Sequence, residues 1–412
     1  MAGLILGDWT HRRGDAGGSR AVSARILNPK PRVAWRYDLA FDGRIEQVRV
    51  VRDVVTIAAT PTIAHSGWQH AEVVALDAAS GRVVGQRRLP DPVPPSTMVA
   101  SLDSVRIIAT RASEPAFLYT LEPGSLAPVS RVRVEEGDVA SLDIVDAWGE
   151  GQELWCQVDT PRRDTRLFIN VANGKAARVR LPIAAELVRE PCLADGSLFV
   201  PLSASSADRD VVHPCVRITG KNVTPIGEPI EVRKGAMAAV VAADGAIHIV
   251  TAEPMSEGGR TFEVSLRAFD RESRLQRGGT RSFELFAPGA ERLRLVRRPS
   301  GELLAQLVDA QMAARSDLFL SDDEGAARLQ LGNKPYVADL ALGDQLVAHR
   351  ELEQGRAVVV GFELDRRMRI LGRRASIRWS FETPAVGSPV ALYAGGGYVF
   401  VRGSRSLLAL EL

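Results

Sequence analysis

The chain has 412 residues, of which 45% are hydrophobic and 25% are charged. Such a composition is that of a globular protein and excludes a disordered or fibrous chain. The 52 basic residues nearly balance the 50 acidic ones, for a net charge of +2, so bulk charge gives no reason to expect binding to nucleic acid or to an anionic membrane. At about 150 residues per domain the length allows two or three domains, although closed all-β folds of this length often form one domain.

The chain has three cysteines, Cys156, Cys192 and Cys215, which form no CxxC pair. An odd number at these spacings predicts neither a disulfide framework nor a structural zinc site, and favours reduced thiols in a cytoplasmic protein. The N-terminal sequence MAGLILGDW lacks a basic leader and has too short an apolar run for a signal peptide. We therefore expect a cytoplasmic protein with no cofactor and no metal.

Short runs of alternating apolar residues flank tight turns throughout the chain, and helical periodicity is weak. Asp-Gly between two β-rich runs is the strongest short hairpin signal. Eight such hairpins follow each other at a mean period of roughly 49 residues. Their turns lie at Arg52–Asp53, near Asp103, at Gly149–Gly151, Asp195–Gly196, Asp244–Gly245, Ser300–Gly301, Gly343–Asp344 and Gly395–Gly397.

A second series of turns follows each of these hairpins, except the last, by about 25 residues. These turns lie at Asp77–Gly81, Glu122–Ser125, Ala172–Gly174, Thr219–Asn222, Asp270–Ser273, Asp322–Gly325 and Asp365–Arg367. Each repeat is thus interpreted as four antiparallel strands, a to d, with the first series joining a to b and the second joining c to d. Four-stranded sheets repeating at this period predict an all-β fold, an eight-bladed β-propeller.

The two ends of the chain complement each other. The eighth unit ends after strand c at Leu412, whereas an unassigned strand, Arg32–Leu39, stands before the first unit and resembles the d strand Ser376–Thr383. We expect Arg32–Leu39 to supply the outer strand of the last blade and so to close the ring. Residues 1–30 are then a flexible tail, and residues 31–412 form one propeller domain.

The two faces of such a propeller differ in their loops. The a–b and c–d turns of one face are tight, whereas the b–c loops of the other face vary in length. The longer ones are Thr60–Ala71, Ser203–Pro214 and Ala252–Thr261, and the shorter ones are Asp159–Thr165 and Asp309–Asp317. Variable loops on a rigid scaffold tend to carry function. We therefore expect partner contacts on the face with the b–c loops.

Aromatic, arginine and methionine side chains in these loops are the candidate contacts, because such residues dominate or adapt to protein interfaces. The predicted partner-binding residues are His65, Trp68, His70, Arg162, Arg163, Arg209, Met255 and Arg315. The alternative for Trp68 is that it covers its own loop, and for the arginines that they form a solvated rim. His65 and His70 lack an evident third ligand, so no metal site is expected.

Two segments resemble the repeat of pyrroloquinoline-quinone-type propellers. Val73–Leu89 has an apolar strand ending in Ala-Leu-Asp, followed by a Ser-Gly turn, and the C-terminal run from Ser388 resembles an a-b-c unit of that superfamily. The resemblance implies an eight-bladed propeller. The superfamily includes quinoprotein dehydrogenases, which carry adjacent cysteines and calcium-binding carboxylates at their cofactor, and adjacent cysteines are absent here.

The sequence lacks GxSxG, HExxH, P-loop and dinucleotide-binding motifs. The main hypothesis is therefore a non-enzymatic bacterial scaffold that binds protein partners, with an AAA+ ATPase or a von Willebrand A-type adaptor as one candidate partner. The alternative is a ligand-binding or enzymatic site in the central channel. Charged candidates for the channel are Arg106, Asp143, Arg189, Glu190, Arg294 and Asp339.

Overall fold

The computed structural model describes most of the chain, with gaps in several loops. The described residues are 4–6, 21–25, 30–61, 70–91, 97–109, 116–134, 143–150, 153–159, 166–172, 175–181, 191–201, 209–256, 259–298, 301–309, 314–316, 318–322, 325–331, 335–364 and 373–412. Apart from the short 3-10 turn η1 (Glu353–Gly355), every regular element in these ranges is a strand.

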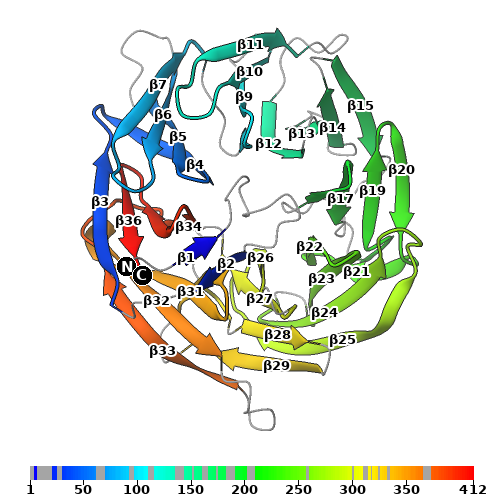
Figure 1. The fold of residues 1–412 in the computed structure, drawn as a ribbon. Helices are drawn as coiled ribbons and strands as arrows, with labels where there is room; N and C mark the ends of the chain where they lie inside the picture. The colour runs from blue at the N-terminus through cyan, green and yellow to red at the C-terminus, as the bar shows by residue number, and fades with distance from the viewer. Residues whose placement is uncertain are drawn as a thin grey trace.

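The strands form sheets arranged radially around a central axis (Figure 1). Six sheets are separate four-stranded antiparallel blades, which are named below by their strands. The first two are β4 (Gly43–Val51), β5 (Val54–Pro61), β6 (Ala71–Asp77) and β7 (Val83–Leu89), then β8 (Met98–Ala100), β9 (Val105–Ala109), β10 (Phe117–Leu121) and β11 (Pro128–Arg133). The next two are β12 (Asp143–Glu150), β13 (Glu153–Asp159), β14 (Arg166–Ala172) and β15 (Lys175–Leu181), then β16 (Cys192–Ala194), β17 (Ser197–Pro201), β19 (Cys215–Thr219) and β20 (Asn222–Ile226). The last two are β22 (Met237–Ala243), β23 (Ala246–Pro254), β24 (Thr261–Asp270) and β25 (Gln276–Phe286), then β34 (Ala391–Gly395), β35 (Tyr398–Arg402), β36 (Ser406–Glu411) and β3 (Arg32–Asp38).

All but two of the remaining described strands belong to one ten-stranded sheet, so the prediction of eight blades is wrong: the described residues form six separate blades. This sheet contains two antiparallel meanders. The first is β26 (Arg292–Arg297), β27 (Leu303–Val308), β28 (Leu318–Asp322) and β29 (Gly325–Gln330), and the second is β30 (Val337–Leu342), β31 (Gln345–Glu351), β32 (Ala357–Leu364) and β33 (Arg373–Glu382). The outer strands β29 and β33 pair in parallel at Leu329–Arg373 and Gln330–Arg374, which joins the two meanders edge to edge.

The same sheet includes two strands from the start of the chain, β1 (Leu4–Leu6) and β2 (Ala21–Arg25). β2 pairs in parallel with the inner strand β30, and both N-terminal strands lie near the centre of the ring in Figure 1. The expected division into a tail up to residue 30 and one propeller domain stays a prediction. In the part of the chain that the structure describes, no helix has the length and apolar character needed to span a bilayer.

The predicted turns agree with the strand register. β4 and β5 are joined at Arg52–Asp53, and β6 and β7 at Asp77–Gly81, as expected. Asp195 and Asp244 adopt positive φ angles of 49° and 50° just before a glycine, the backbone conformation that the two-residue hairpins require. The predicted turn at Asp365–Arg367 lies outside the described residues.

The predicted closure by the N-terminal strand is confirmed. β3 pairs antiparallel with β36, from Arg32 opposite Glu411 to Asp38 opposite Ser406. The side chain of Trp35 continues this seam to the neighbouring blade, where its Nε1–H donates to the carbonyl oxygen of Ala78, 2.7 Å away. Its ring covers Gly81, where a β-carbon would lie 2.6 Å from the indole. Glycine is therefore required in this turn both for its positive φ of 69° and for the close approach.

Inner and outer strands differ in composition because only the inner ones are covered on both faces. All five residues of β9 (VRIIA) are buried, whereas five of the six residues of the outer strand β11 (PVSRVR) are exposed. The hydrophobic core lies between neighbouring blades: Ala58, Val73 and Leu89 of the β4–β7 blade pack in one cluster with Ile107 of the next. Burial between radial sheets thus divides the core into separate clusters, most of them between neighbouring sheets.

Candidate functional site

The structure describes part of the predicted partner-binding set. His65, Trp68, Arg162 and Arg163 lie outside the described residues. Arg209 is described in its backbone alone, while His70, Met255 and Arg315 are described with their side chains.

The b–c loop that carries Arg209 contains an additional strand. β18 (Arg209–Val212) pairs antiparallel with β21 (Ile230–Arg233), which belongs to the segment leading out of β20 toward the next blade. The two strands form a separate two-stranded sheet, here called the loop ribbon. Val212 and Val232 are buried together within it. One strand of the ribbon thus lies in the predicted loop Ser203–Pro214, and the ribbon has a small apolar core of its own.

One arginine attaches the loop ribbon to the neighbouring blade. The Nη1 atom of Arg233, at the end of β21, donates to the carbonyl oxygen of Met255 at 2.6 Å and contacts that of Pro254 at 3.4 Å. In turn the backbone N–H of Met255 donates to the carbonyl oxygen of Thr261. Two loops with predicted contacts, those of Arg209 and Met255, are therefore brought together.

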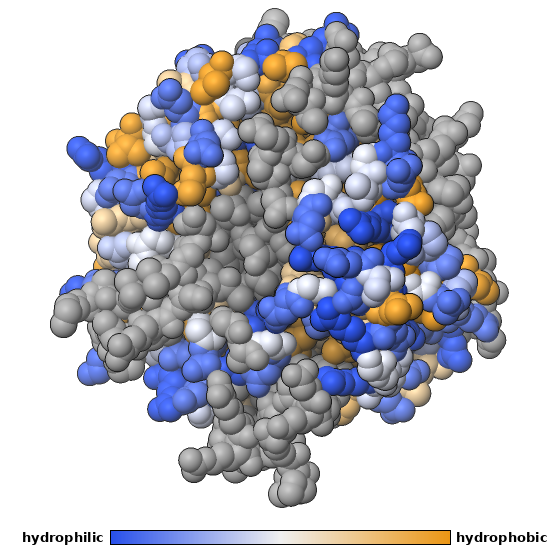
Figure 2. Space-filling view, turned by 45° about the vertical axis from the view of Figure 1, so that its right-hand side comes forward, coloured by the Kyte–Doolittle hydropathy of each residue, from blue (hydrophilic) through white to orange (hydrophobic). Residues whose placement is uncertain are grey.

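Three apolar side chains are exposed where these segments meet, and together they are called the docking patch: Val211, Met255 and Phe286. Their exposed fractions are 70%, 43% and 55%. Val211 lies on the ribbon, and Phe286 ends β25 opposite Thr261, next to the Met255 loop. Figure 2 shows this side of the ring, where hydrophobic side chains lie among hydrophilic ones. Sequence analysis included Val211 in the loop Ser203–Pro214 without selecting it, because single valines are not typical interface residues, and Phe286 was missed because it ends an ordinary strand.

Charged side chains cross the blade next to the docking patch. Glu253, Glu263 and Glu284 lie opposite one another on three adjacent strands. Burial raises the pKa of the Glu253 carboxyl and lowers the pKa of the Arg267 guanidinium, although each group partly offsets the effect on the other by its charge. Three like-charged residues in register destabilise a sheet, so this arrangement is maintained against local stability.

The other two described candidates are engaged in local contacts. His70 Nδ1 lies 3.1 Å from Nη2 of Arg88 on β7. Arg315 forms an ion pair with Asp309 of its own loop, with its Nη2 atom 2.6 Å from the carboxylate. Arg315 therefore stabilises the loop that carries it, and His70 contacts the outer strand of its own blade.

Two of the charged candidates for the central channel, Arg294 and Asp339, are used in contacts between neighbouring sheet units. Arg294 donates from Nε to the carbonyl oxygen of Ala338 and from Nη2 to Oδ1 of Asp339, each at 2.6 Å. The second carboxylate oxygen of Asp339 is bonded to Nδ1 of His349. All three side chains are buried. Arg106 is buried as well, the Asp143 side chain is not described, and Arg189 and Glu190 lie outside the described residues.

A similar contact links the first two blades. Gln47 accepts a hydrogen bond from the backbone N–H of Met98 at 2.7 Å, and Arg49 donates from Nε to the Met98 carbonyl oxygen at 2.8 Å. Between the meanders Gln306 and Arg294 bind the backbone of Ala338 in the same way. These buried side chains complete the hydrogen bonding of the next inner strand, so we assign the Arg294 network to stability.

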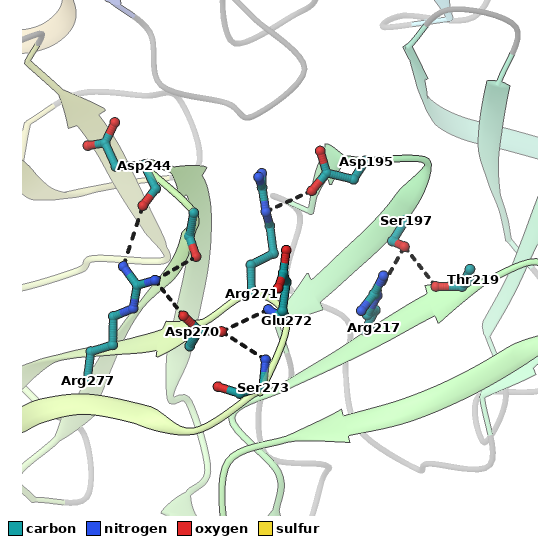
Figure 3. A network of polar contacts seen from close by, with 11 residues as sticks. Asp195, Ser197, Arg217, Thr219, Asp244, Asp270, Arg271, Glu272, Ser273 and Arg277 are labelled. Carbon is teal, nitrogen blue, oxygen red and sulfur yellow. Dashed lines mark hydrogen bonds and ion pairs between the residues drawn. The ribbon is translucent and has the colours of Figure 1, made fainter.

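The tight-turn face is held by charged contacts between blades (Figure 3). Arg271 of the β22–β25 blade pairs with Asp195 of the preceding blade, Nε to Oδ2 at 2.8 Å. Within its own blade Arg277 binds Asp270 at 2.5 Å and contacts the backbone oxygen of Asp244. The hydrogen bond from Arg277 is the main cause of the lowered pKa of Asp270. These charged groups are paired among themselves.

The three cysteines are free and buried. Burial raises the pKa of Cys215 well above its usual value, with the nearby Cys192 thiol adding to the effect. Among the described residues no group of three His, Cys, Asp or Glu side chains could hold a metal ion.

Comparison with known proteins shows the fold. No protein-family model matches the sequence, and no curated protein matches it. Among solved structures, a europium-containing methanol dehydrogenase aligns with a TM-score of 0.56 and 8% identity, over 98% of both chains. The quinohemoprotein alcohol dehydrogenases of Pseudomonas putida HK5 (ADHIIG) and Comamonas testosteroni align with TM-scores of 0.53 and 0.54, each at 11% identity over 98% of this chain and 80% of theirs. The chain has the quinoprotein-type propeller fold. At this identity the likeness concerns the fold and not the activity.

Proposed function

We propose that this protein is a non-enzymatic, cytoplasmic propeller scaffold that binds a protein partner through the docking patch of Val211, Met255 and Phe286. The observation that carries the proposal is the loop ribbon. Segments from two connections of one blade pair as a sheet, pack two valines inside, and still expose Val211 almost fully. A loop that merely connected strands would need no such sheet.

The energetics of the patch favour a protein as the ligand. Methionine and phenylalanine provide large adaptable apolar contacts, and protein interfaces commonly place such residues inside a polar rim. The surrounding glutamates and arginines supply that rim at Glu253, Glu263 and Arg233. Because Arg233 holds ribbon and blade together, the patch is preorganised, which lowers the entropic cost of binding.

The partner we propose to test first is an AAA+ ATPase or a von Willebrand A-type adaptor of a bacterial multi-protein system, because some bacterial operons pair such propellers with these proteins. A propeller suits such an assembly because its rigid ring presents several loops without moving them.

Site-specific photocrosslinking tests the proposal. A photoreactive amino acid is placed in the full chain at Val211, at Phe286, or at the control position Leu275, an apolar residue 71% exposed beyond the c–d turn of the same blade. In lysate of the native host we expect one discrete crosslinked protein from Val211 and Phe286 and none from Leu275.

A second variant distinguishes specific docking at the patch from nonspecific crosslinking. Met255→Glu places a charge in the patch at a side chain that is 43% exposed, so it should abolish the crosslink from Val211 while circular dichroism shows the fold retained and the melting temperature changes little. A crosslink that persists in this variant, or one that forms equally from Leu275, contradicts the proposed function.

A further inference from the structure

The outer rim of the ring carries a pocket that belongs neither to the docking patch nor to the contacts between inner strands. It lies between the outer strands of the β4–β7 and β8–β11 blades and has a volume of about 170 Å³. This pocket, here called the rim pocket, is lined by Arg87, Arg88, Leu89, Pro90, Tyr119, Leu121, Pro128, Val129, Ser130 and Arg131. In Figure 1 β7 and β11 lie at the top of the ring, away from β21 and β25. The rim pocket is therefore a different surface from the docking patch.

A buried polar network forms one wall of the rim pocket. The Tyr119 hydroxyl donates to Oδ2 of Asp91 at 2.6 Å, and Arg131 donates from Nε to the same hydroxyl oxygen at 2.9 Å. The Arg131 guanidinium also lies 3.7 Å from the centre of the Phe117 ring. Burial, aided by the Asp91 carboxylate, raises the pKa of Tyr119 to about 12. Arg131 is thus held in place by an aromatic ring and a buried carboxylate.

The opposite wall adds Arg87 from β7, which is exposed and forms no ion pair with any described residue. The next residue, Arg88, lies opposite Glu72 and contacts His70, and side chains alternate along a strand, so its guanidinium lies on the other face of the blade. Arg87 and Arg131 therefore line the same pocket, and the Asp91 carboxylate beside it is already bound to Tyr119 and Arg131. The excess positive charge favours an anionic ligand.

The volume of the rim pocket and the strands beside it indicate which class of anionic ligand it binds. The pocket is smaller than sites for drug-sized molecules, which occupy about 300–1,000 Å³, so it accommodates one side chain. β7 and β11 are the edge strands of their sheets, and Val129 at the rim is 61% exposed. Arginine forks match carboxylate geometry, and sheet edges accept extended segments.

We propose that the rim pocket binds a carboxylate side chain of an acidic, extended segment of a partner protein, between Arg87 and Arg131, with an apolar residue of the same segment on Val129. This inference does not rest on the proposed function, because it concerns another surface and its test needs no natural partner.

The test measures binding of a fluorescein-labelled eight-residue peptide of alternating Glu and Val to the full chain by fluorescence anisotropy. We expect saturable binding that weakens as NaCl is raised, since exposed charge pairs are screened by salt. A peptide of alternating Gln and Val should not bind. Inorganic phosphate should compete poorly, because it lacks the apolar contact. Equal binding of the Gln peptide, or displacement by phosphate at the concentration at which the peptide itself competes, overturns the proposal.

Matched variants locate the site. Arg87→Gln removes one exposed guanidinium and should weaken binding by about 3- to 10-fold, the range of a single charge-assisted contact. Arg87→Glu should abolish binding. The control Arg82→Gln makes the same charge change about 17 Å away along the chain and should leave the affinity within twofold. Equal losses in Arg82→Gln and Arg87→Gln would show unspecific attraction and overturn the assignment.

Discussion

The Trp35 indole N–H donates to the carbonyl oxygen of Ala78, 43 residues later in the chain and in the next blade of the ring. The hydrogen bond crosses the seam at which the N-terminal strand completes the last blade, since β3 pairs with β36 and Trp35 covers the Gly81 turn of the β4–β7 blade. A single side chain thus connects the beginning of the propeller, its C-terminal strand and its first complete blade.

Replacing Trp35 should therefore destabilise the whole ring. Trp35→Ala removes a buried aromatic side chain and should lower the free energy of unfolding by about 3–5 kcal/mol. Trp35→Phe retains most of the packing and loses the hydrogen bond, so its cost should be smaller. Chemical denaturation of both variants measures the effect. Removing residues 1–40 should destabilise the chain at least as much, and a truncated chain with an unchanged melting temperature would disprove the role of the seam.

Breaking the buried Arg294–Asp339 ion pair should lower the free energy of unfolding by a similar amount. Asp339→Ala leaves the buried Arg294 guanidinium without its carboxylate, and breaking a buried ion pair on one side costs about 3–5 kcal/mol. The double variant Arg294→Met/Asp339→Ala removes both charges and should be more stable than Asp339→Ala alone. Urea denaturation compares the two. A double variant less stable than Asp339→Ala would argue against the ion pair as the cause.

The raised pKa of Glu253 predicts that the stability of the folded protein depends on pH. Burial raises its pKa in the folded state, so the folded protein binds more protons than the unfolded chain between the unfolded and folded pKa values. Its contribution to stability is present below the unfolded pKa and is lost as pH rises through the folded pKa. Glu253→Gln should therefore flatten the loss of stability with rising pH and stabilise the protein slightly at pH 7. Melting curves between pH 4 and pH 7 test this, with exposed Glu272→Gln as control.

The buried thiols predict slow chemical modification. Because Cys156, Cys192 and Cys215 are buried, and burial raises the pKa of Cys215, a thiol reagent such as DTNB should react little with the native protein. In guanidinium chloride all three should react quickly. A native thiol that reacts at the unfolded rate would show that the β16–β20 or β12–β15 blade opens locally.

The strands of the blades, their tight turns and the closure of the ring could be predicted from the sequence, because they depend on local alternation and on glycine-containing turns. The turn at Asp77–Gly81 and the strand at Arg32–Leu39 were predicted from a few neighbouring residues and are found as expected. The partner contacts expected in the loops of Arg209 and Met255 stay a prediction.

Tertiary structure alone decided how these pieces meet. The parallel pairing of Leu329 with Arg373 joins two meanders that the turn count separates, since edge pairing depends on the approach of strands distant in sequence. The same holds for Val211 and Phe286, whose exposure follows from the position of the loop ribbon, and for Arg87 and Arg131, which come from different blades. Local sequence patterns specify backbone conformation, whereas sites formed between blades depend on which surfaces the closed ring brings together.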